Sequence, residues 1–525
     1  MKKRWFAREW LYDRPWALAF LWLVPAALLP VVPIDETRYL SIAWEMRQSG
    51  DAIGLTLNGH PYMDKSPLLF WLVNVAWAVF GVSTLAARLV CIGFAAGAVA
   101  TVTSLARRLG LEDPASAGWM LLPFVVFGAF TPIAMFDVPL VFFVVLALLG
   151  LVVCMQGRLA DGAAILLVAS TLGMLAKGPV YLVHLIGPLA AMRWWHGHAL
   201  DRPWRLAAVI AACLLAACAP LAAWGVINAM RIHGVPVLQS LTHQSLGRVS
   251  QSFAHDRSTL WYVPWILPFL LPWTFLLRWT RLRRGLLHLP ASPAGRLAIA
   301  STLPAFIAFS LISGKQIHYL LPLLPGAALG FAALSTRDRE AFAFGRGRWL
   351  LVAAALAWTW PVANAVVGMR GNPTWYVAAV VAAALLSLGA IGTRRMASWD
   401  AGSRLRGASF AALAAVMASV LLMGMHVKAH MDPGELADAV LQRRSEGMLV
   451  AAVDDEPAMV TYLARLSTPL PRITDTAAWA REHPGGLALV HSGRGEPPSY
   501  VDTPILLADG WAGLVPASRL AQVHP

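Results

Sequence analysis

The stretch between residues 35 and 67 gathers acidic and basic side chains in a chain that carries few of them. Its charged residues include Asp35, Glu36, Arg38, Asp64 and Lys65, and they follow soon after the first apolar run. A carboxylate can accept the proton of an attacking hydroxyl, and arginine or lysine can hold a phosphate group and stabilise its charge. This stretch is therefore the first place where we expect chemistry.

Further polar residues stand at the ends of later apolar runs. They are Asp137, Lys177, the loop residues His233, His243, Arg248, His255 and Asp256, and then Lys315, His318 and Tyr319. With a cytoplasmic N-terminus, all of these positions fall on the outer face of a membrane. Ionisable residues at membrane depth are costly and suggest function, although any one of them could also be an ordinary solvated loop charge. As a set, acids and cations at a membrane face suit the transfer of a group from a lipid phosphate to a hydroxyl.

The sequence contains neither a Walker loop nor a G-x-G-x-x-G segment after a predicted strand. Because no nucleotide site is visible, we expect the donor to arrive through the bilayer, already activated on a lipid.

The composition indicates a membrane protein. Hydrophobic residues make up 58% of the chain and charged residues 13%, with a mean hydropathy of +0.61, whereas about a quarter of the residues in soluble domains are charged. The net charge of +14 comes from basic clusters between apolar runs, which is the pattern of cytoplasmic loops. We therefore expect membrane lipids as partners and no nucleic acid.

The apolar runs predict an all-α polytopic protein with about 13 transmembrane helices. The predicted spans are 15–33, 82–106, 116–132, 138–155, 162–176, 179–194, 206–227, 260–277, 295–313, 318–335, 347–367, 374–393 and 407–425. The first run could also be a signal peptide, but we find no persuasive cleavage site after it and interpret it as a retained span. Segments Glu36–Ser49 and Ser66–Phe80 have the pattern of helices that lie on the membrane surface. An odd number of spans places the C-terminus outside.

The composition changes after Met425, which divides the chain into a transmembrane domain (1–425) and a small C-terminal domain (426–525). In the second part, 448–453, 487–490 and 505–507 suit strands, and 458–465 and 477–482 suit helices. We predict a small α/β domain outside the membrane. Its role is either to steady the membrane part or to bind substrate.

Five segments carry a resemblance to a known family. They read IDETRYLSIAWEMRQSGDAIGLTLNGHPYMDKSPLLFW, AMFDVPL, LAKGPV, HDRSTLWYVPWILPFLLPW and SGKQIHYLLPLLPG. In this order they resemble the integral-membrane glycosyltransferases that include the aminoarabinose transferase of lipid A and, more distantly, the protein O-mannosyltransferases. The resemblance covers residues 10–340 and weakens after them. It implies a GT-C fold, with interfacial helices in the first external loop and a cavity open to the outer face.

The same resemblance implies the reaction and the roles of individual residues. The donor would be a polyprenyl-phosphate sugar, the acceptor lipid A or another envelope glycan, and the configuration at the sugar C1 would be inverted. Asp35 would be the general base or would orient the acceptor, with Asp137 as the second acid. The residues that would surround the donor phosphate are Arg38, Lys65, Lys177, Lys315 and Tyr319. The protein would lie in a bacterial inner membrane, with its N-terminus cytoplasmic and its C-terminal domain periplasmic.

A metal site is a further implication of the family. In the family, an acid beside the first-loop lysine and a histidine of the long loop can share a divalent metal, and the matching positions are Asp64 and His255. The family commonly has Glu where this chain has Asp64, and Ser66 is an insertion where Lys-Pro is common. Two protein ligands are few for a zinc site, so a structural hydrogen bond between Asp64 and His255 is the alternative. We expect no required cofactor.

Two other functions compete with transfer. A transporter or flippase would move lipid-linked sugars without chemistry, and its charges should lie within the spans. The charges in this sequence stand at span ends on one side, which favours the enzyme. A structural membrane subunit is the third possibility, in which outer-face Asp and Lys residues would tolerate alanine.

Overall fold

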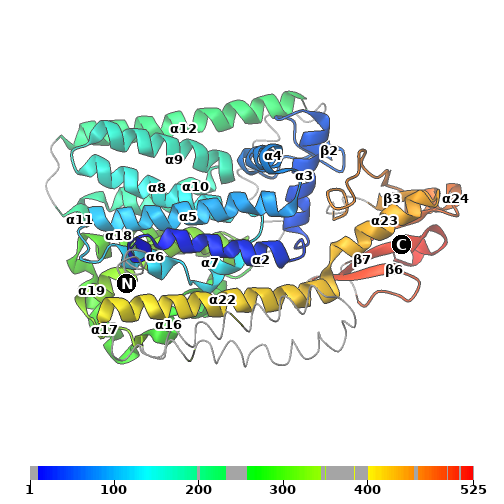
Figure 1. The fold of residues 1–525 in the computed structure, drawn as a ribbon. Coiled ribbons are helices and arrows are strands. Elements are labelled where there is room, and N and C mark those ends of the chain that lie inside the picture. Colours follow the sequence, from blue (N-terminus) through cyan, green and yellow to red (C-terminus); the bar gives the residue numbers. More distant parts are fainter. Residues whose placement is uncertain are drawn as a thin grey trace.

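The computed structural model describes residues 10–197, 202–231, 257–344, 349, 384, 400–453, 459–492, 495–507 and 510–523. A bundle of long helices runs in one common direction, and a small α/β unit stands beyond one end of this bundle (Figure 1). The polytopic helical class predicted from the composition is confirmed.

Seven helices in the described part of the chain are long and apolar enough to cross a membrane. Their bounds are α5 Thr84–Arg108, α8 Asp137–Met155, α9 Leu159–Lys177, α12 Pro203–Arg231, α18 Pro293–Leu311, the continuous η4 Ile317–Leu323 and α19 Leu324–Arg337, and α22 Ala401–Met431. Of the predicted spans, 347–367 and 374–393 lie outside the described residues apart from one residue in each. The predicted number of 13 is therefore not confirmed.

Several predicted spans consist of short helical pieces. The pieces are η1 Pro15–Trp22 with α2 Leu23–Leu28, α6 Ala115–Leu121 with α7 Val125–Phe130, α10 Val180–Ala190 with α11 Met192–His196, and η2 Thr259–Trp265 with α15 Ile266–Phe269 and α16 Trp273–Leu276. The prediction of one continuous span over 260–277 is wrong. Pro264, Pro268 and Pro272 fall in this stretch, and a proline inside a helix removes a hydrogen bond and clashes with the preceding turn. Pro123 separates α6 from α7 for the same reason.

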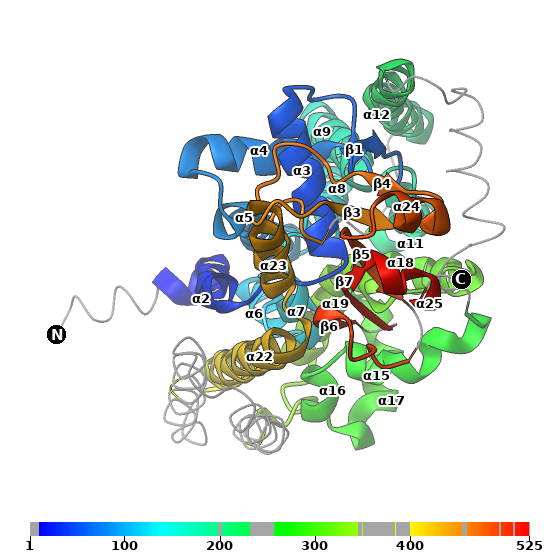
Figure 2. The ribbon, with the colours of Figure 1, turned by 90° about the vertical axis from the view of Figure 1, so that its right-hand side faces the viewer.

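Two helices cross the end of the bundle that faces the α/β unit. They are α3 (Asp35–Ser49) and α4 (Leu68–Phe80), and both run across the direction of the long helices (Figures 1 and 2). The interfacial helices predicted for these segments are confirmed. A hairpin of β1 (Thr56–Leu57) and β2 (His60–Pro61) lies between them, and the Glu45 carboxylate of α3 accepts hydrogen bonds from its backbone N–H groups at Asn58 and Gly59.

The C-terminal unit is a mixed sheet with helices. Its elements are α23 Pro433–Ser445, β3 Val450–Val453, β4 Arg472–Ile473, α24 Thr476–Glu482, β5 Leu487–Ser492, β6 Asp502–Leu507, β7 Gly510–Pro516, η7 Ala517–Arg519 and α25 Leu520–Val523. The strand order is β4-β3-β5-β7-β6, with β3 parallel to β4 and β5, and β7 antiparallel to β5 and β6. Alternate residues of the strands supply separate apolar cores on the two faces.

Secondary structure in this unit differs from the sequence prediction in several places, and α23 and β4 are among the elements that were not predicted. The helix predicted over 458–465 is wrong, because residues 459–465 form turns. Strand β7 was not predicted, since two glycines and a terminal proline lower its strand propensity. It forms because it pairs with β5 over six residues, from Ser492–Trp511 to Leu487–Pro516.

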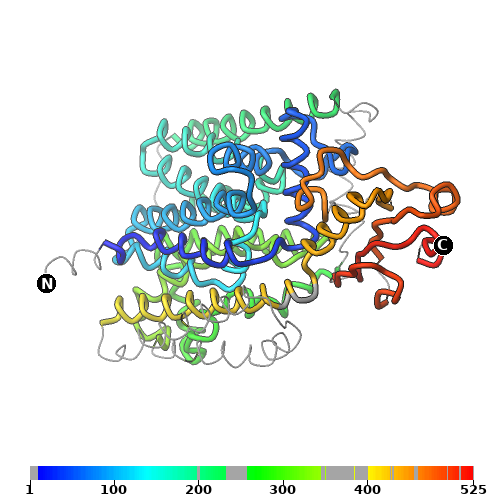
Figure 3. Tube along the Cα trace, turned by 45° about the vertical axis from the view of Figure 1, so that its right-hand side comes forward, coloured from blue at the N-terminus to red at the C-terminus, as the bar shows by residue number. Residues whose placement is uncertain are grey.

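The turns at 459–466 attach the C-terminal unit to the end of the bundle (Figure 3). The ring of Tyr462 stacks on Trp77 of α4 with centroids 5.4 Å apart, and Tyr462 N–H donates to Ser41 Oγ of α3 at 3.2 Å. Trp44 Nε1 of α3 donates to the Leu466 carbonyl at 2.8 Å. Tyr462 is buried among residues of the bundle. The helices α3 and α4 therefore contact the bundle on one side and the turns of the C-terminal unit on the other.

Candidate active site

Two opposite charges stand at neighbouring ends of the helices α8 and α9. These helices are joined by a short turn and pack along their length, so the first residue of α8, Asp137, lies beside the last residue of α9, Lys177. Lys177 Nζ donates to Asp137 Oδ1. Each charge also suits its helix end, since acids are favoured at helix N-termini and cations at C-termini. Asp137 is 2% exposed, so Lys177 compensates a carboxylate that is buried.

The segment η4 supplies a histidine and a tyrosine to this pair. His318 Nε2 lies 4.0 Å from Asp137 Oδ2, and the Lys177 amine lies 4.9 Å from the ring centroid of Tyr319. The rings of His318 and Tyr319 are themselves 4.8 Å apart. Residues from three separate helical segments therefore meet at the end of the bundle that α3 covers.

The first turn of α3 brings a second acid to the same region. Asp35 Oδ1 accepts a hydrogen bond from Tyr39 Oη at 3.1 Å and lies 3.6 Å from Arg38 Nη1. The Tyr39 ring packs edge-on against Phe136, the neighbour of Asp137, with centroids 4.8 Å apart. Tyr39 thus contacts Asp35 through its hydroxyl and the residue next to Asp137 through its ring.

Tyr39 is buried, and this burial together with the nearby Asp35 raises the pKa of its hydroxyl well above 10.0. The hydroxyl therefore stays protonated at neutral pH and remains a hydrogen-bond donor to Asp35. The Lys65 amine lies 6.0 Å from the centroid of the Tyr39 ring, which brings the first-loop lysine to the same side.

A buried ion pair that the sequence analysis did not single out fixes the entry of α3. Glu36 Oε2 accepts from Arg88 Nη2 of α5 at 2.7 Å, and Glu36 Oε1 accepts from Arg88 Nε at 2.8 Å. Glu36 Oε1 also accepts from the backbone N–H of Ala134 at 2.8 Å, three residues before Asp137. Arg88 donates to the carbonyls of Ala26, Leu29 and Pro30 as well. The sequence signal for this ion pair is Arg88 itself, because an arginine inside an apolar run needs a partner of opposite charge.

Lys315 occupies a different position from the other predicted phosphate ligands. Its side chain is 2% exposed, and its amine donates to the carbonyl oxygen of Ile312 and to that of Arg257 at 3.0 Å. In this conformation Lys315 ties the start of η2 to the loop before η4.

The residues implied for a metal are only partly described. Asp64 is exposed in the loop before α4, whereas His255 and the other loop residues from His233 to Asp256 lie outside the described residues. The described part of the chain contains no group of three or more His, Cys, Asp or Glu side chains that could hold a metal ion. Because only one of the two implied ligands is described, the metal site stays a prediction.

The sequence has relatives among membrane transferases. Residues 18–233 match the family described as dolichyl-phosphate-mannose-protein mannosyltransferase. The undecaprenyl phosphate-α-4-amino-4-deoxy-L-arabinose arabinosyl transferase of Pseudomonas paraeruginosa is 30% identical over 356 residues, which is 64% of this chain and 61% of that protein. The Pseudomonas aeruginosa LESB58 protein of the same name is 30% identical over 62% of this chain and 59% of its own length. The chain thus matches about three fifths of the length of these relatives.

The fold is similar to that of a solved structure over nearly the whole chain. ArnT from Cupriavidus metallidurans bound to undecaprenyl phosphate superimposes with a TM-score of 0.71 at 18% identity, covering 95% of this chain and 97% of that one. Its apo state gives the same TM-score and identity and covers 98% and 99%. The fold therefore defines a polytopic membrane protein of the GT-C class with a small C-terminal α/β unit. The sequence matches agree with the resemblance found in the motifs, because the chain is similar to aminoarabinose transferases over about three fifths of its length.

Proposed function

We propose that the protein is a membrane glycosyltransferase that moves a sugar from a polyprenyl-phosphate donor to an acceptor hydroxyl or phosphate by inverting single displacement. The observation that carries this proposal is the meeting of Asp35, Asp137 and Lys177 with His318 and Tyr319 at one end of the bundle. The names of the sequence relatives and the undecaprenyl phosphate bound to the similar ArnT structure support this donor class.

The reaction forms a bond between the acceptor oxygen and C1 of the sugar and breaks the bond from C1 to the phosphate oxygen. The electron pair of the broken bond stays on the leaving polyprenyl phosphate, and the acceptor proton passes to a carboxylate. Asp35 is the better base of the two acids, because its side chain is 35% exposed and its contacts with Tyr39 and Arg38 both involve Oδ1.

Asp137 suits a positioning role. It is buried and already bonded to Lys177, so taking up a proton would leave the Lys177 charge without its partner. Its two oxygens instead hold Lys177 on one side and lie near His318 on the other. This arrangement presents the Lys177 amine over the ring of Tyr319.

Arg38, Lys65, Lys177 and Tyr319 are the proposed donor-phosphate group. Their charges and hydroxyl balance the negative charge that develops on the leaving phosphate. Lys315, predicted for the same group, donates to backbone carbonyls in this conformation, and we assign it to the support of the loop before η4.

We further propose that the site faces the outer side of a bacterial inner membrane, with the N-terminus cytoplasmic and the C-terminal unit periplasmic. The arginine-rich end of the bundle, which includes α17 (Trp279–His288), lies opposite to α3 (Figure 1), in accord with the positive-inside rule. Lipid A or another envelope glycan is then the accessible acceptor.

A transfer assay tests this function. Purified protein would receive radiolabelled polyprenyl-phosphate sugars, among them 4-amino-4-deoxy-L-arabinose, with lipid A or an envelope extract, and the Asp35→Asn variant would be run beside it. We expect label in the acceptor with the wild type and a loss of roughly 10²–10⁴ in rate with the variant. Donor that crosses vesicle membranes without transfer would instead establish a flippase.

A further inference from the structure

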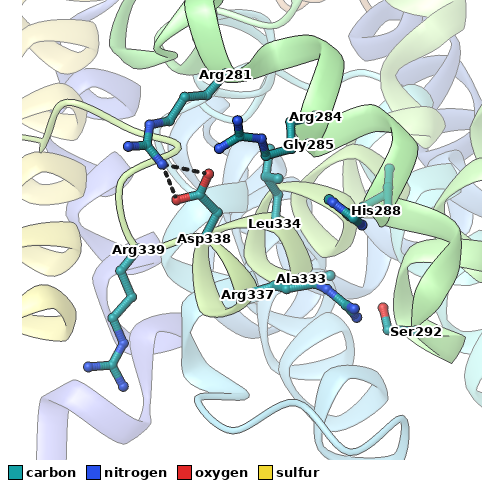
Figure 4. Close-up of a pocket in the computed structure, with 11 residues that line it drawn as sticks. Arg281, Arg284, Gly285, His288, Ser292, Ala333, Leu334, Arg337, Asp338 and Arg339 are labelled. Carbon is teal, nitrogen blue, oxygen red and sulfur yellow. Dashed lines mark hydrogen bonds and ion pairs between the residues drawn. The ribbon is translucent and has the colours of Figure 1, made fainter.

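A second charged site lies at the end of the bundle away from α3. A cavity of about 440 Å³ opens between α17 and the C-terminal end of α19, and we call it the distal basic pocket. Its lining side chains are shown in Figure 4, and they include Arg281, Arg284, His288, Ser292, Arg337, Asp338 and Arg339. Four arginines against one aspartate make the lining strongly positive.

Among the described residues, only Arg281 of these arginines is neutralised by a neighbouring acid. Arg281 Nη1 lies 3.3 and 3.4 Å from the two oxygens of Asp338, and Arg281 also pairs with Glu340 outside the pocket. Arg284 and Arg337 have no ion pair with any acid in the described part of the chain. Two guanidinium groups are therefore available to an anion.

Figure 4 shows how the side chains are arranged around the pocket. His288, Arg337 and Ser292 lie on one side of the pocket, Arg281 and Arg284 lie on the other, and Arg339 extends away from both groups. Ser292 is the N-cap of α18 and accepts from the Gly295 N–H, so its own hydroxyl proton remains a donor. Ala333 and Leu334 of α19 are buried below these polar groups. A phosphate group in the pocket would therefore have a guanidinium on either side to donate charge-assisted hydrogen bonds.

The helix α17 indicates that the anion belongs to a lipid. It is a basic helix whose apolar side chains Trp279, Leu286 and Leu287 are 50%, 56% and 70% exposed. A helix with cationic and exposed apolar faces lies in the membrane interface. The distal basic pocket is then at the depth of the phospholipid headgroups, and an acyl chain can run along the exposed leucines.

We propose that the distal basic pocket binds the phosphate of an anionic phospholipid through Arg284 and Arg337. The proposal is independent of the transfer reaction, because it concerns the opposite end of the bundle. Arg283 offers a matched control. It is exposed on the same helix, but it does not line the pocket, and it represents the solvated arginines that the positive-inside rule alone accounts for.

The experiment measures lipid binding to the purified full chain in a neutral detergent. Native mass spectrometry would follow titration with phosphatidylglycerol, with zwitterionic phosphatidylethanolamine, and with inorganic phosphate as a competitor. We expect phosphatidylglycerol to bind to the wild type and to Arg283→Gln with affinities within about twofold of each other. We expect the double variant Arg284→Gln, Arg337→Gln to bind at least about tenfold more weakly, because two charge-assisted hydrogen bonds are lost.

Other outcomes would overturn the proposal in different ways. Equal losses in Arg283→Gln and the double variant would mean that only overall charge matters. Equal binding of both phospholipids would remove the role of the anion. Displacement of the lipid by millimolar inorganic phosphate would assign the pocket to a free phosphate. The melting temperature without lipid checks folding, and the single variant Arg337→Gln, at an exposed helix end, provides the same comparison if the double variant does not fold.

Discussion

The carboxylate of Glu36 and the guanidinium of Arg88, 52 positions apart in the chain, form a buried ion pair in which each residue is 1% exposed. The pair also binds the Ala134 N–H and the carbonyls of residues 26, 29 and 30. It thereby holds the residue next to Asp35 and the segment that leads to Asp137 at a fixed separation. The geometry of the proposed site depends on this contact, although neither residue is proposed to touch a substrate.

Removal of one partner of this ion pair should destabilise the protein strongly. We expect Glu36→Ala to cost about 3–5 kcal/mol, because it leaves a buried guanidinium uncompensated. Thermal unfolding in detergent would measure the loss. Arg158→Gln is the control, since Arg158 pairs with Asp161 at an exposed position, and such pairs contribute about 0–1 kcal/mol. Similar effects of the two variants would contradict the structural role of Glu36.

Asp35→Asn should abolish most transfer while the protein stays folded. The amide keeps the shape of the side chain but cannot take the acceptor proton, so we expect a rate loss of roughly 10²–10⁴. The comparison is Asp51→Asn, which changes an acid in the first loop that pairs with Arg231. If both variants keep near-normal turnover and melting temperature, Asp35 is not the base.

Asp137 and Lys177 should behave as one unit. Lys177→Met leaves the buried Asp137 charge unpaired, so we expect both stability and transfer to fall. The double variant with Asp137→Asn should recover part of the stability, giving a coupling free energy of about 0.5–3 kcal/mol in a double-mutant cycle. Strictly additive melting data from the four proteins would show that the pair is not coupled.

The hydroxyl of Tyr39 should remain protonated well into the alkaline range. Because burial and then Asp35 raise its pKa above 10.0, its contribution to stability is complete below this ordinary value and is lost as the pH rises through the higher folded value. The difference in phenolate absorbance between the wild type and Tyr39→Phe should be absent at pH 10 and appear only above it. If Tyr39→Phe instead removes a tyrosine that titrates near pH 10 in the wild type, the raised pKa of Tyr39 is contradicted.

Tyr462 should hold the C-terminal unit against the interfacial helices. Its ring is 1% exposed and stacked on Trp77, so we expect Tyr462→Ala to cost about 3–5 kcal/mol at the junction, as large aromatic truncations do. Limited proteolysis around residues 432–458 should become faster. Tyr500 is a half-buried tyrosine elsewhere in the same unit, and Tyr500→Ala should leave the cleavage rate nearly unchanged. Equal acceleration of cleavage by both variants would show that Tyr462 does not specifically hold the junction.

Much of the local structure could be predicted because it depends on nearby residues. The apolar periodicity of residues 36–49 predicted α3, and the apolar residues Tyr39, Ile42 and Met46 are buried, although Glu36 and Glu45 are buried as well. The change of composition after Met425 indicated the C-terminal α/β unit. The broken span at 260–277 shows the limit of hydropathy, since the three prolines interrupt a run that is apolar enough to span.

The sequence by itself determined the class of the protein, the interfacial helices and the set of outer-end acids and cations, because hydropathy and charge act along the chain. Only the tertiary structure decided how these groups are paired. Asp137 is compensated by Lys177, Asp35 is left accessible, and Lys315 is directed to backbone carbonyls. Sequence distance does not encode these pairings, since a buried charge is stabilised by whichever partner the packing of the helices brings within a few ångströms of it.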